Sequence, residues 1–164
     1  MSQKIKNALI SLSDKSQIAR VLKVLQKYRI NIISSGGTYK EIKKLGHKCT
    51  EISKYTKFSE MLDGRVKTLH PKIHAGILSK RSNSKHRREM NRKKFNYIDL
   101  IIVNFYPFQQ TIQKTKNFKK IIENIDIGGP TMVRAAAKNF HDVSIITDKK
   151  DYSPLINELN KNKG

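Results

Sequence analysis

The sequence predicts a single α/β domain built on a parallel β-sheet with helices on both faces. Three observations support this fold class. Short, nearly continuous apolar runs alternate with amphipathic helical patterns, as they do in parallel β-α-β units. The 164 residues suffice for one domain with a core and are too few for two comfortable ones. No linker-like segment and no internal repeat divides the chain.

The first third of the chain shows the clearest alternation. Residues 8–11, ALIS, predict a buried strand. An amphipathic helix should follow, because apolar residues recur over residues 18–25 at the i, i+3, i+4, i+7 spacing. Residues 30–34 predict a second strand, followed by a helix over residues 38–45. Residues 48–52 are a weak third strand.

The middle of the chain has no clear periodicity. Residues 54–79 match neither a helical nor a strand spacing, yet they contain the stretch DGRVKTLHPKIHAGIL, with three cations, two histidines, a proline and two glycines. Its apolar run over residues 73–78 is expected to anchor a loop to the sheet. Residues 82–94 are rich in Lys, Arg and Asn and predict a solvated helix or loop. The charged stretch is therefore either a basic surface loop or a site.

The last third returns to regular elements. Residues 100–103 form the strongest predicted strand. Two helices are expected after it, over residues 119–124 and residues 131–138. A last strand over residues 143–147 and a last helix over residues 153–159 complete the order.

The net charge is the most unusual feature of the composition. Lys and Arg number 34 against 13 Asp and Glu, a formal net charge of +21. A charge of this size indicates an anionic partner, such as nucleic acid, an acidic membrane surface or a phosphorylated metabolite. The alternative is compositional drift, because Lys, Asn and Ile are abundant, Trp is absent, and the lysines are scattered rather than striped.

Cysteine content and hydropathy limit the class of protein. The single cysteine, Cys49, excludes an internal disulfide and a cysteine-based zinc site. The N-terminus has no apolar core long enough for a signal peptide, and no run approaches the roughly 18 apolar residues of a membrane span. We therefore expect a soluble cytoplasmic protein without a membrane partner.

Polar and glycine-rich segments follow the predicted strands at their carboxyl ends, where ligands bind in open parallel sheets. Ser13 and Lys15 follow the first strand. The segment SSGGT, residues 34–38, follows the second, and its glycines and helix N-terminus suit an anion. Asn104 and Tyr106 follow the fourth. These groups are expected to meet at one edge of the sheet.

A fourth loop adds to this convergence. Asp126 precedes two glycines and a helix start, and that helix places Arg134 and Lys138 on one face. Four separate loops thus bring polar groups to the same edge. Their agreement is stronger evidence for a binding site than any single motif.

Several common site motifs are missing. His70 and His74 have an i, i+4 spacing that could suit zinc on a helix, but Pro71 lies between them. There is no HExxH pattern and no evident third ligand, so a structural or substrate-adjacent role is favoured and no metal is expected. The sequence also lacks the GxSxG, GxGxxG and GxxxxGK patterns of serine hydrolases, dinucleotide sites and NTP sites.

Taken together, the segments SDKS, SSGGT, DGRVKTLHPKIHAGIL, NFYPF and NIDIGGPTMVRAAAKN resemble the IMP cyclohydrolase domains of bifunctional purine biosynthesis proteins. The match runs in order from about residue 8 to residue 159. The resemblance implies a methylglyoxal-synthase-like (Rossmann-like) parallel α/β fold. It also implies that residues 1–164 are one such domain, incomplete at its C-terminus and without the AICAR transformylase domain. Gln17 stands where the family has glycine.

The resemblance assigns roles to individual residues. The nucleotide phosphate would be held by Ser13, Asp14, Lys15, Ser35, Gly36, Gly37, Thr38, Arg65, Lys67 and Thr68. The base would meet Asn104, Phe105, Tyr106, Asp126 and Ile127. The catalytic groups would be Lys67, Tyr106, Asp126 and Lys138.

The implied reaction is closure of the purine ring, in which formyl-AICAR loses water to give IMP. Lys67 and Lys138 could stabilise the formyl oxygen or deliver a proton, and Asp126 and Tyr106 could accept or relay the amide proton. The implied partner is a small nucleotide, with no cofactor for this step and a homodimer in the full-length protein. There the step is coupled to a formyltransferase that uses 10-formyltetrahydrofolate.

Three alternatives remain open from the sequence. The net charge could mark a basic nucleic-acid-binding module, although zinc-finger spacing, an RNP-type strand and a basic helix with heptads are all missing. Because the sequence lacks these readout motifs, no specific nucleic-acid partner is expected. A second alternative is another phosphate-recognising lyase of the same fold, such as a methylglyoxal synthase. The third is a folded but inactive fragment.

Overall fold

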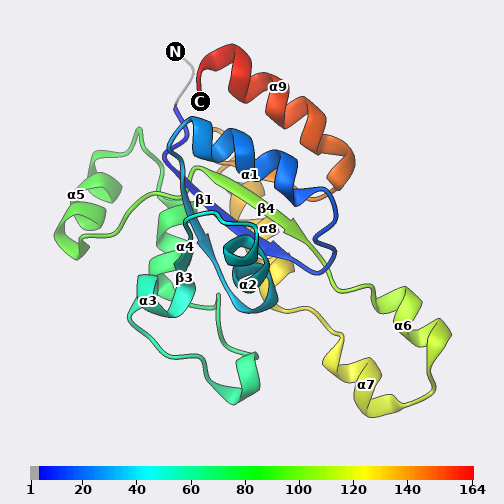
Figure 1. The fold of residues 1–164 in the computed structure, drawn as a ribbon. Coiled ribbons are helices and arrows are strands. Elements are labelled where there is room, and N and C mark those ends of the chain that lie inside the picture. The colour runs from blue at the N-terminus through cyan, green and yellow to red at the C-terminus, as the bar shows by residue number, and fades with distance from the viewer. Residues whose placement is uncertain (1–3) are drawn as a thin grey trace.

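A computed structural model describes residues 4–164 and contains a five-stranded, all-parallel sheet in the order β3-β2-β1-β4-β5 (Figure 1). The predicted parallel α/β fold is confirmed. The strands are β1 (Asn7–Leu12), β2 (Asn31–Ser34), β3 (Thr50–Glu51), β4 (Leu100–Asn104) and β5 (Ser144–Ile146).

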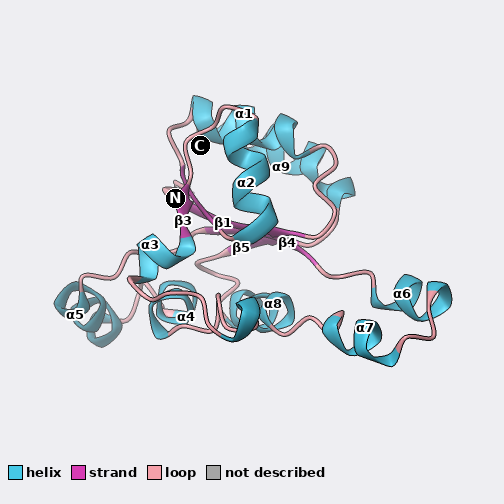
Figure 2. Ribbon diagram, turned by 60° about the horizontal axis from the view of Figure 1, so that its bottom comes forward, coloured by secondary structure: helices cyan, strands magenta, loops and turns pink. Residues whose placement is uncertain are grey.

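Helices cover both faces of the sheet (Figure 2). One face carries α1 (Ile18–Lys27), α2 (Gly36–Lys44) and α9 (Tyr152–Asn162). The other face carries α3 (Ile52–Thr56), α4 (Pro71–Leu78) and α8 (Gly128–Lys138). Short 3-10 turns lie at Leu62–Gly64 and Lys149–Asp151.

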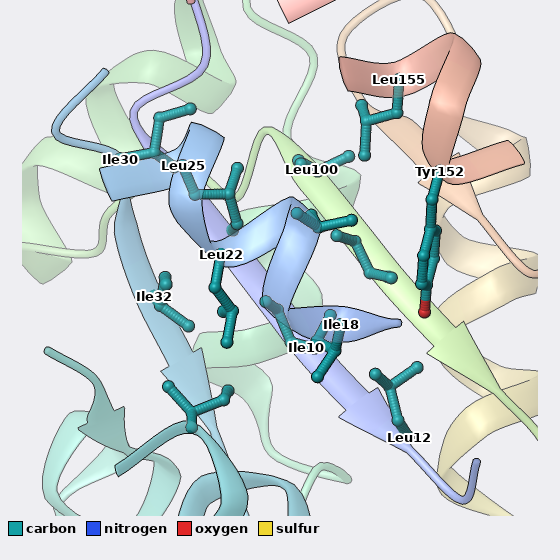
Figure 3. Packing of buried hydrophobic residues seen from close by; sticks show 14 of the residues in the cluster. Ile10, Leu12, Ile18, Leu22, Leu25, Ile30, Ile32, Leu100, Tyr152 and Leu155 are labelled. Carbon is teal, nitrogen blue, oxygen red and sulfur yellow. The ribbon is translucent and has the colours of Figure 1, made fainter. Parts of the chain in front are cut away.

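Side chains of the central strands alternate between two apolar cores, as the pleat of a strand requires. Ile10 and Leu100 point into the core beneath α1 and α9, together with Tyr152 (Figure 3). Leu9 and Ile101 point into the core against α4 and α8. The strands are therefore buried on both faces, which explains their nearly continuous apolar sequences.

Two helical segments project from opposite ends of the sheet (Figures 1 and 2). One is α5 (Ser84–Lys93), whose only buried residue is Met90. The other consists of α6 (Phe108–Lys114) and α7 (Phe118–Glu123), neither of which buries a residue, and is called here the α6–α7 arm. Within residues 4–164, no helix is both long enough and apolar enough to span a membrane.

Residues 73–78 are anchored to the sheet as expected, because Ile73 and Ile77 are buried against Leu9 and Ile101, but they form helix α4 rather than a loop. Pro71 occupies the first turn, where its missing N–H is no loss, and His70 Nδ1 accepts a hydrogen bond from Lys72 N at 3.1 Å. Gly76 is needed because a Cβ there would lie 2.8 Å from the carbonyl oxygen of Asn96. The flanking proline and this glycine concealed the helical pattern.

Candidate functional site

A cavity of about 630 Å³ opens at the carboxyl ends of β1, β2 and β4. It is lined by the segments that follow these strands, by residues 63–68 and by the beginning of α8. β1 is the central strand, β2 and β3 lie on one side of it, and the chain returns to pair β4 on its other side. This reversal of strand order is where open parallel sheets bind ligands.

The N-terminus of α2 forms one end of the cavity. A Cβ atom added to Gly36 would lie 3.4 Å from Lys67 Nζ, and one added to Gly37 would lie 3.7 Å from Lys15 Nζ. Gly36 also has a φ of +54°, a conformation that side chains disfavour. Two ammonium groups thus lie against a helix N-terminus, which is itself an anion site. Ser35, the N-cap, does not use its hydroxyl for capping.

Asn104 fixes the loop that follows β1. Its Oδ1 accepts hydrogen bonds from Ser13 N at 2.7 Å and Asp14 N at 3.0 Å, and its Nδ2 donates to Asp14 O at 2.8 Å. Lys15 Nζ donates to Ser13 O at 3.0 Å. Asn104 lines the cavity, but its amide is committed to this loop, so its contacts position the loop that carries Lys15.

Asp14 is turned toward a different part of the chain. Its Oδ1 accepts from Ser16 N at 2.9 Å, and its Oδ2 pairs with Lys149 Nζ at 3.0 Å. The pKa of Asp14 is lowered to about 2, chiefly by the backbone N–H of Ser16, then by the Ser16 hydroxyl and Lys149. Asp14 does not line the cavity.

Thr38 is buried, and its hydroxyl is used within the fold. Oγ1 accepts from Leu12 N at 2.9 Å and donates to Leu12 O at 3.0 Å. These bonds join the first turn of α2 to the end of β1. An anion at the helix N-terminus would therefore meet the backbone of this turn rather than the Thr38 hydroxyl.

The two cations of the RVK segment are each paired with a carboxylate. Lys67 Nζ lies 3.1 Å from Glu60 Oε1, and Arg65 forms an ion pair with Glu123 of α7. Glu123 also lines the cavity, so the α6–α7 arm closes one of its walls. Gly64, at φ +88°, leaves room for the Lys67 side chain, which a Cβ there would meet.

The beginning of α8 forms the other end of the cavity. Asp126 Oδ1 accepts a hydrogen bond from Gly129 N at 2.8 Å and so caps this helix. A Cβ on Gly128 would collide with the Thr68 hydroxyl, and one on Gly129 would lie 2.9 Å from the Phe105 ring. The two glycines therefore allow these side chains to pack directly against the helix start.

The structure brings most of the predicted site residues together. Those that line the cavity are Ser13, Lys15, Ser35, Gly36, Gly37, Thr38, Arg65, Lys67, Thr68, Asn104, Tyr106, Asp126 and Ile127. Asp14, Phe105 and Lys138 do not line it. Lys138 is exposed at the C-terminal end of α8, ten positions after Gly128 and so about 15 Å along the axis from the cavity end.

Sequence reasoning missed the arm residues Ile122 and Glu123, and also Asp63 and Ile125, which line the cavity from segments that it did examine. The arm residues follow no motif, and only the path of the arm brings them back to the strand ends. Nothing in the sequence around Glu123 indicates that it pairs with Arg65, which lies 58 positions away.

His74 has a structural position beside the site. Its ring is hydrogen-bonded to the backbone of Thr68, and its Nε2 is buried without a partner. Burial lowers the pKa of His74 below its ordinary value. No group of three or more His, Cys, Asp or Glu side chains arranged to hold a metal occurs among residues 4–164.

The depressed pKa of His74 predicts a pH dependence of stability. The folded chain disfavours protonation of this ring because burial lowers its pKa, whereas the unfolded chain takes up a proton near the reference pKa of about 6.5. The contribution of the neutral His74 ring to the free energy of unfolding is therefore complete above a pH of about 6.5. It is lost as the pH falls from there toward the lower pKa of the folded state. In urea unfolding from pH 8 to pH 5, His74→Phe should flatten the fall in unfolding free energy relative to the wild type.

The matched control is His141→Gln, because His141 is exposed. This variant should retain the wild-type pH profile. Identical profiles for the wild type and His74→Phe would contradict the assignment.

Comparisons with known proteins agree with the observed fold. The model of the MGS-like domain matches residues 17–131. The chain is 50% identical over 157 residues to the bifunctional purine biosynthesis protein PurH of Clostridium perfringens, covering 96% of this chain and 31% of that protein. It is 52% identical over 160 residues to PurH of Acetivibrio thermocellus, covering 97% of this chain and 31% of that protein.

A solved structure is also similar. The crystal structure of ForH superposes with a TM-score of 0.85 at 30% sequence identity, covering 96% of this chain and 79% of that chain. The present chain spans about a third of the length of the PurH proteins that it matches.

Proposed function

The chain belongs to the MGS-like domain family, and from this premise we propose that it is the IMP cyclohydrolase part of a purine biosynthesis enzyme. Its reaction would close formyl-AICAR to IMP with loss of water. The observation that carries the proposal is a single cavity with two cationic side chains at one helix N-terminus and a carboxylate at another. Its relatives are named for purine biosynthesis, where such nucleotides occur.

The α2 end of the cavity suits the phosphate of the nucleotide. Lys15 and Lys67 lie against Gly36 and Gly37, where backbone N–H groups at a helix N-terminus attract an anion. Arg65 can join them by exchanging Glu123 for the phosphate. The position of Lys67 at this end favours phosphate binding as a large part of its role, beside the acid role that the resemblance implies.

The α8 end suits the reacting groups. The carboxamide nitrogen attacks the formyl carbon, loses a proton, and leaves negative charge on the former formyl oxygen. Asp126 would accept that proton, directly or through Tyr106, and the positive end of the α8 dipole would stabilise the oxygen. Protonation of this oxygen and loss of water then complete the ring.

Lys138 can take part only if another copy supplies it. It lies outside the cavity of its own chain, at the far end of α8. A homodimer that brings this helix end to the partner's cavity would reconcile its proposed catalytic role with its position. No cofactor is proposed for the ring closure, and the location proposed for such an enzyme is the cytoplasm.

The test is IMP formation by the purified 164-residue chain from formyl-AICAR, followed by absorbance at several protein concentrations. Turnover should be inhibited by IMP and not by inosine, because inosine lacks the phosphate. A specific activity that rises with protein concentration would support the dimer. A folded chain that binds IMP but does not form it from formyl-AICAR would contradict the proposal and indicate an inactive fragment. A folded chain that neither binds IMP nor forms it would exclude the cavity as the nucleotide site.

A further inference from the structure

The helix α5 lies at the opposite end of the sheet from the α6–α7 arm and the cavity (Figures 1 and 2). It is inserted between α4 and β4 and contributes a single side chain, Met90, to the interior. The cavity does not include any of its residues. Whatever α5 does is therefore separate from nucleotide chemistry.

The surface of α5 is strongly cationic. We define its basic surface as the exposed side chains Lys85, Arg87, Arg88, Arg92, Lys93 and Lys94. Glu89 is the only acidic residue of the helix. None of the six cations lies within ion-pair distance of a carboxylate among residues 4–164. The like charges repel one another, so an anion placed on this surface would relieve that repulsion.

The basic surface is held in a fixed conformation. Asn83 caps the helix, accepting hydrogen bonds from Lys85 N at 2.9 Å and His86 N at 3.2 Å. Arg81, just before the helix, is largely buried and pairs with Asp99 at 2.7 Å. Arg87 Nη1 donates to the carbonyl oxygen of Arg81 at 2.7 Å. The charges therefore sit on an anchored helix rather than on a free tail.

The chemistry of α5 narrows the class of partner. A helix that inserts into a membrane surface needs an apolar face, and the one large apolar residue of α5, Met90, is buried in the domain. A platform for single-stranded bases needs exposed aromatic rings, and none lies on α5. The nearby Tyr97 ring is covered by Arg81, whose Cζ lies 5.1 Å from the ring centroid. The exposed cations of α5 can therefore make charge contacts only, and the phosphates of a double helix are a partner that such contacts suit.

We propose that the basic surface of α5 docks on the phosphate backbone of double-stranded nucleic acid, without preference for base sequence. Lys85, Arg88 and Arg92 share one face at i, i+3 and i+7. They span about 10 Å along the helix axis, a length over which a duplex carries about six phosphates on its two strands, at one per roughly 1.7 Å of duplex axis. The expected absence of a specific nucleic-acid partner is compatible with this mode, because phosphate contacts carry no sequence information.

Salt dependence provides the test. The 164-residue chain is titrated against a fluorescent 20-base-pair DNA duplex of arbitrary sequence between 50 and 200 mM salt. Each neutralised phosphate contributes about −0.9 to the slope of log K against log salt, so substituting three contacting cations should make the slope less negative by about 2.7. The variant is Lys85→Gln/Arg88→Gln/Arg92→Gln, and its affinity at 50 mM salt should fall at least about tenfold.

The matched control is Lys23→Gln/Lys44→Gln/Lys161→Gln, which removes three exposed lysines from α1, α2 and α9 and changes the net charge equally. It should keep most of the wild-type affinity and slope. Equal losses in both triple variants would overturn the proposal, since binding would then follow total charge. No duplex binding at 50 mM salt, or tighter binding to vesicles with anionic lipids at equal phosphate concentration, would overturn it as well. IMP formation should be unchanged in the α5 variant.

Discussion

Substitution of Asp126 by asparagine should lower the turnover number for ring closure by about 10²–10⁴-fold, with little change in nucleotide affinity. In the structure the Asp126 carboxylate has two tasks, since it caps α8 through Gly129 N and lines the cavity. Asparagine can still accept the Gly129 hydrogen bond, because Asn and Asp are about equally good caps. It cannot accept the amide proton. Steady-state kinetics of IMP formation, with IMP affinity measured separately, would isolate the chemical step.

The comparison with Asp126→Ala separates the two tasks. Alanine removes the cap as well, so it should also lower the unfolding free energy by about 0.5–2 kcal/mol. Asp126→Asn should unfold at nearly the wild-type urea concentration. A near-normal turnover number for Asp126→Asn would exclude Asp126 as the proton acceptor and leave it a capping residue.

Substitution of Arg81 by methionine should lower the free energy of unfolding by about 3–5 kcal/mol, because it leaves a buried carboxylate without its cation. The Asp99 side chain is only 7% exposed and lies 2.7 Å from Arg81 Nη2. Its other oxygen accepts from the backbone N–H groups of Lys6 and Asn7, each at 2.8 Å. Arg81 N also donates to Asp142 at 2.9 Å. This cluster joins the beginnings of β1 and β4 to the segment before β5.

Urea unfolding of three variants tests this role. Arg92→Met removes an exposed arginine and should change the unfolding free energy by no more than about 0.5 kcal/mol. Arg81→Met combined with Asp99→Asn should recover part of the loss, because the buried charge is then gone. A loss below 1 kcal/mol for Arg81→Met would show that solvent compensates Asp99, contrary to the burial seen here.

Regular elements were predictable wherever one apolar period dominated. The strand at residues 100–103 and the helix carrying Val21 and Leu22 are present as expected, because both bury a continuous or periodic apolar face. Helix α6 was missed, because its seven residues contain only one apolar i, i+4 pair, Phe108 and Ile112, which is too little to define an apolar face. Gln17 has a left-handed φ of 64°, a backbone conformation that glycine adopts more easily than other residues. A pattern of apolar residues carries no information about such a backbone conformation.

The site was predictable to the extent that its parts follow strands. Ser13, Ser35 and Asn104 each stand where a parallel strand ends, and the sheet brings these ends together. Which atoms remain free for a ligand could not be predicted. The Thr38 hydroxyl and the Asn104 amide are both used by the fold, and only the tertiary structure shows their partners. The roles in catalysis stay predictions.

The order of the strands has a consequence for how the chain acquires its site during folding. β1 pairs with β2 across 24 positions (Asn7 to Asn31) and with β4 across 92 positions (Ala8 to Leu100). Closing the longer loop costs about 1.2 kcal/mol more chain entropy, roughly two doublings of loop length. The Ser35–Thr38 turn belongs to the local pairing, whereas Asn104 arrives only with β4. A chain in which only β1 and β2 have paired already has the glycine turn at the N-terminus of α2. The loop that carries Lys15 still lacks its hydrogen bonds to Asn104. The long-range pairing is therefore the step that completes the cavity.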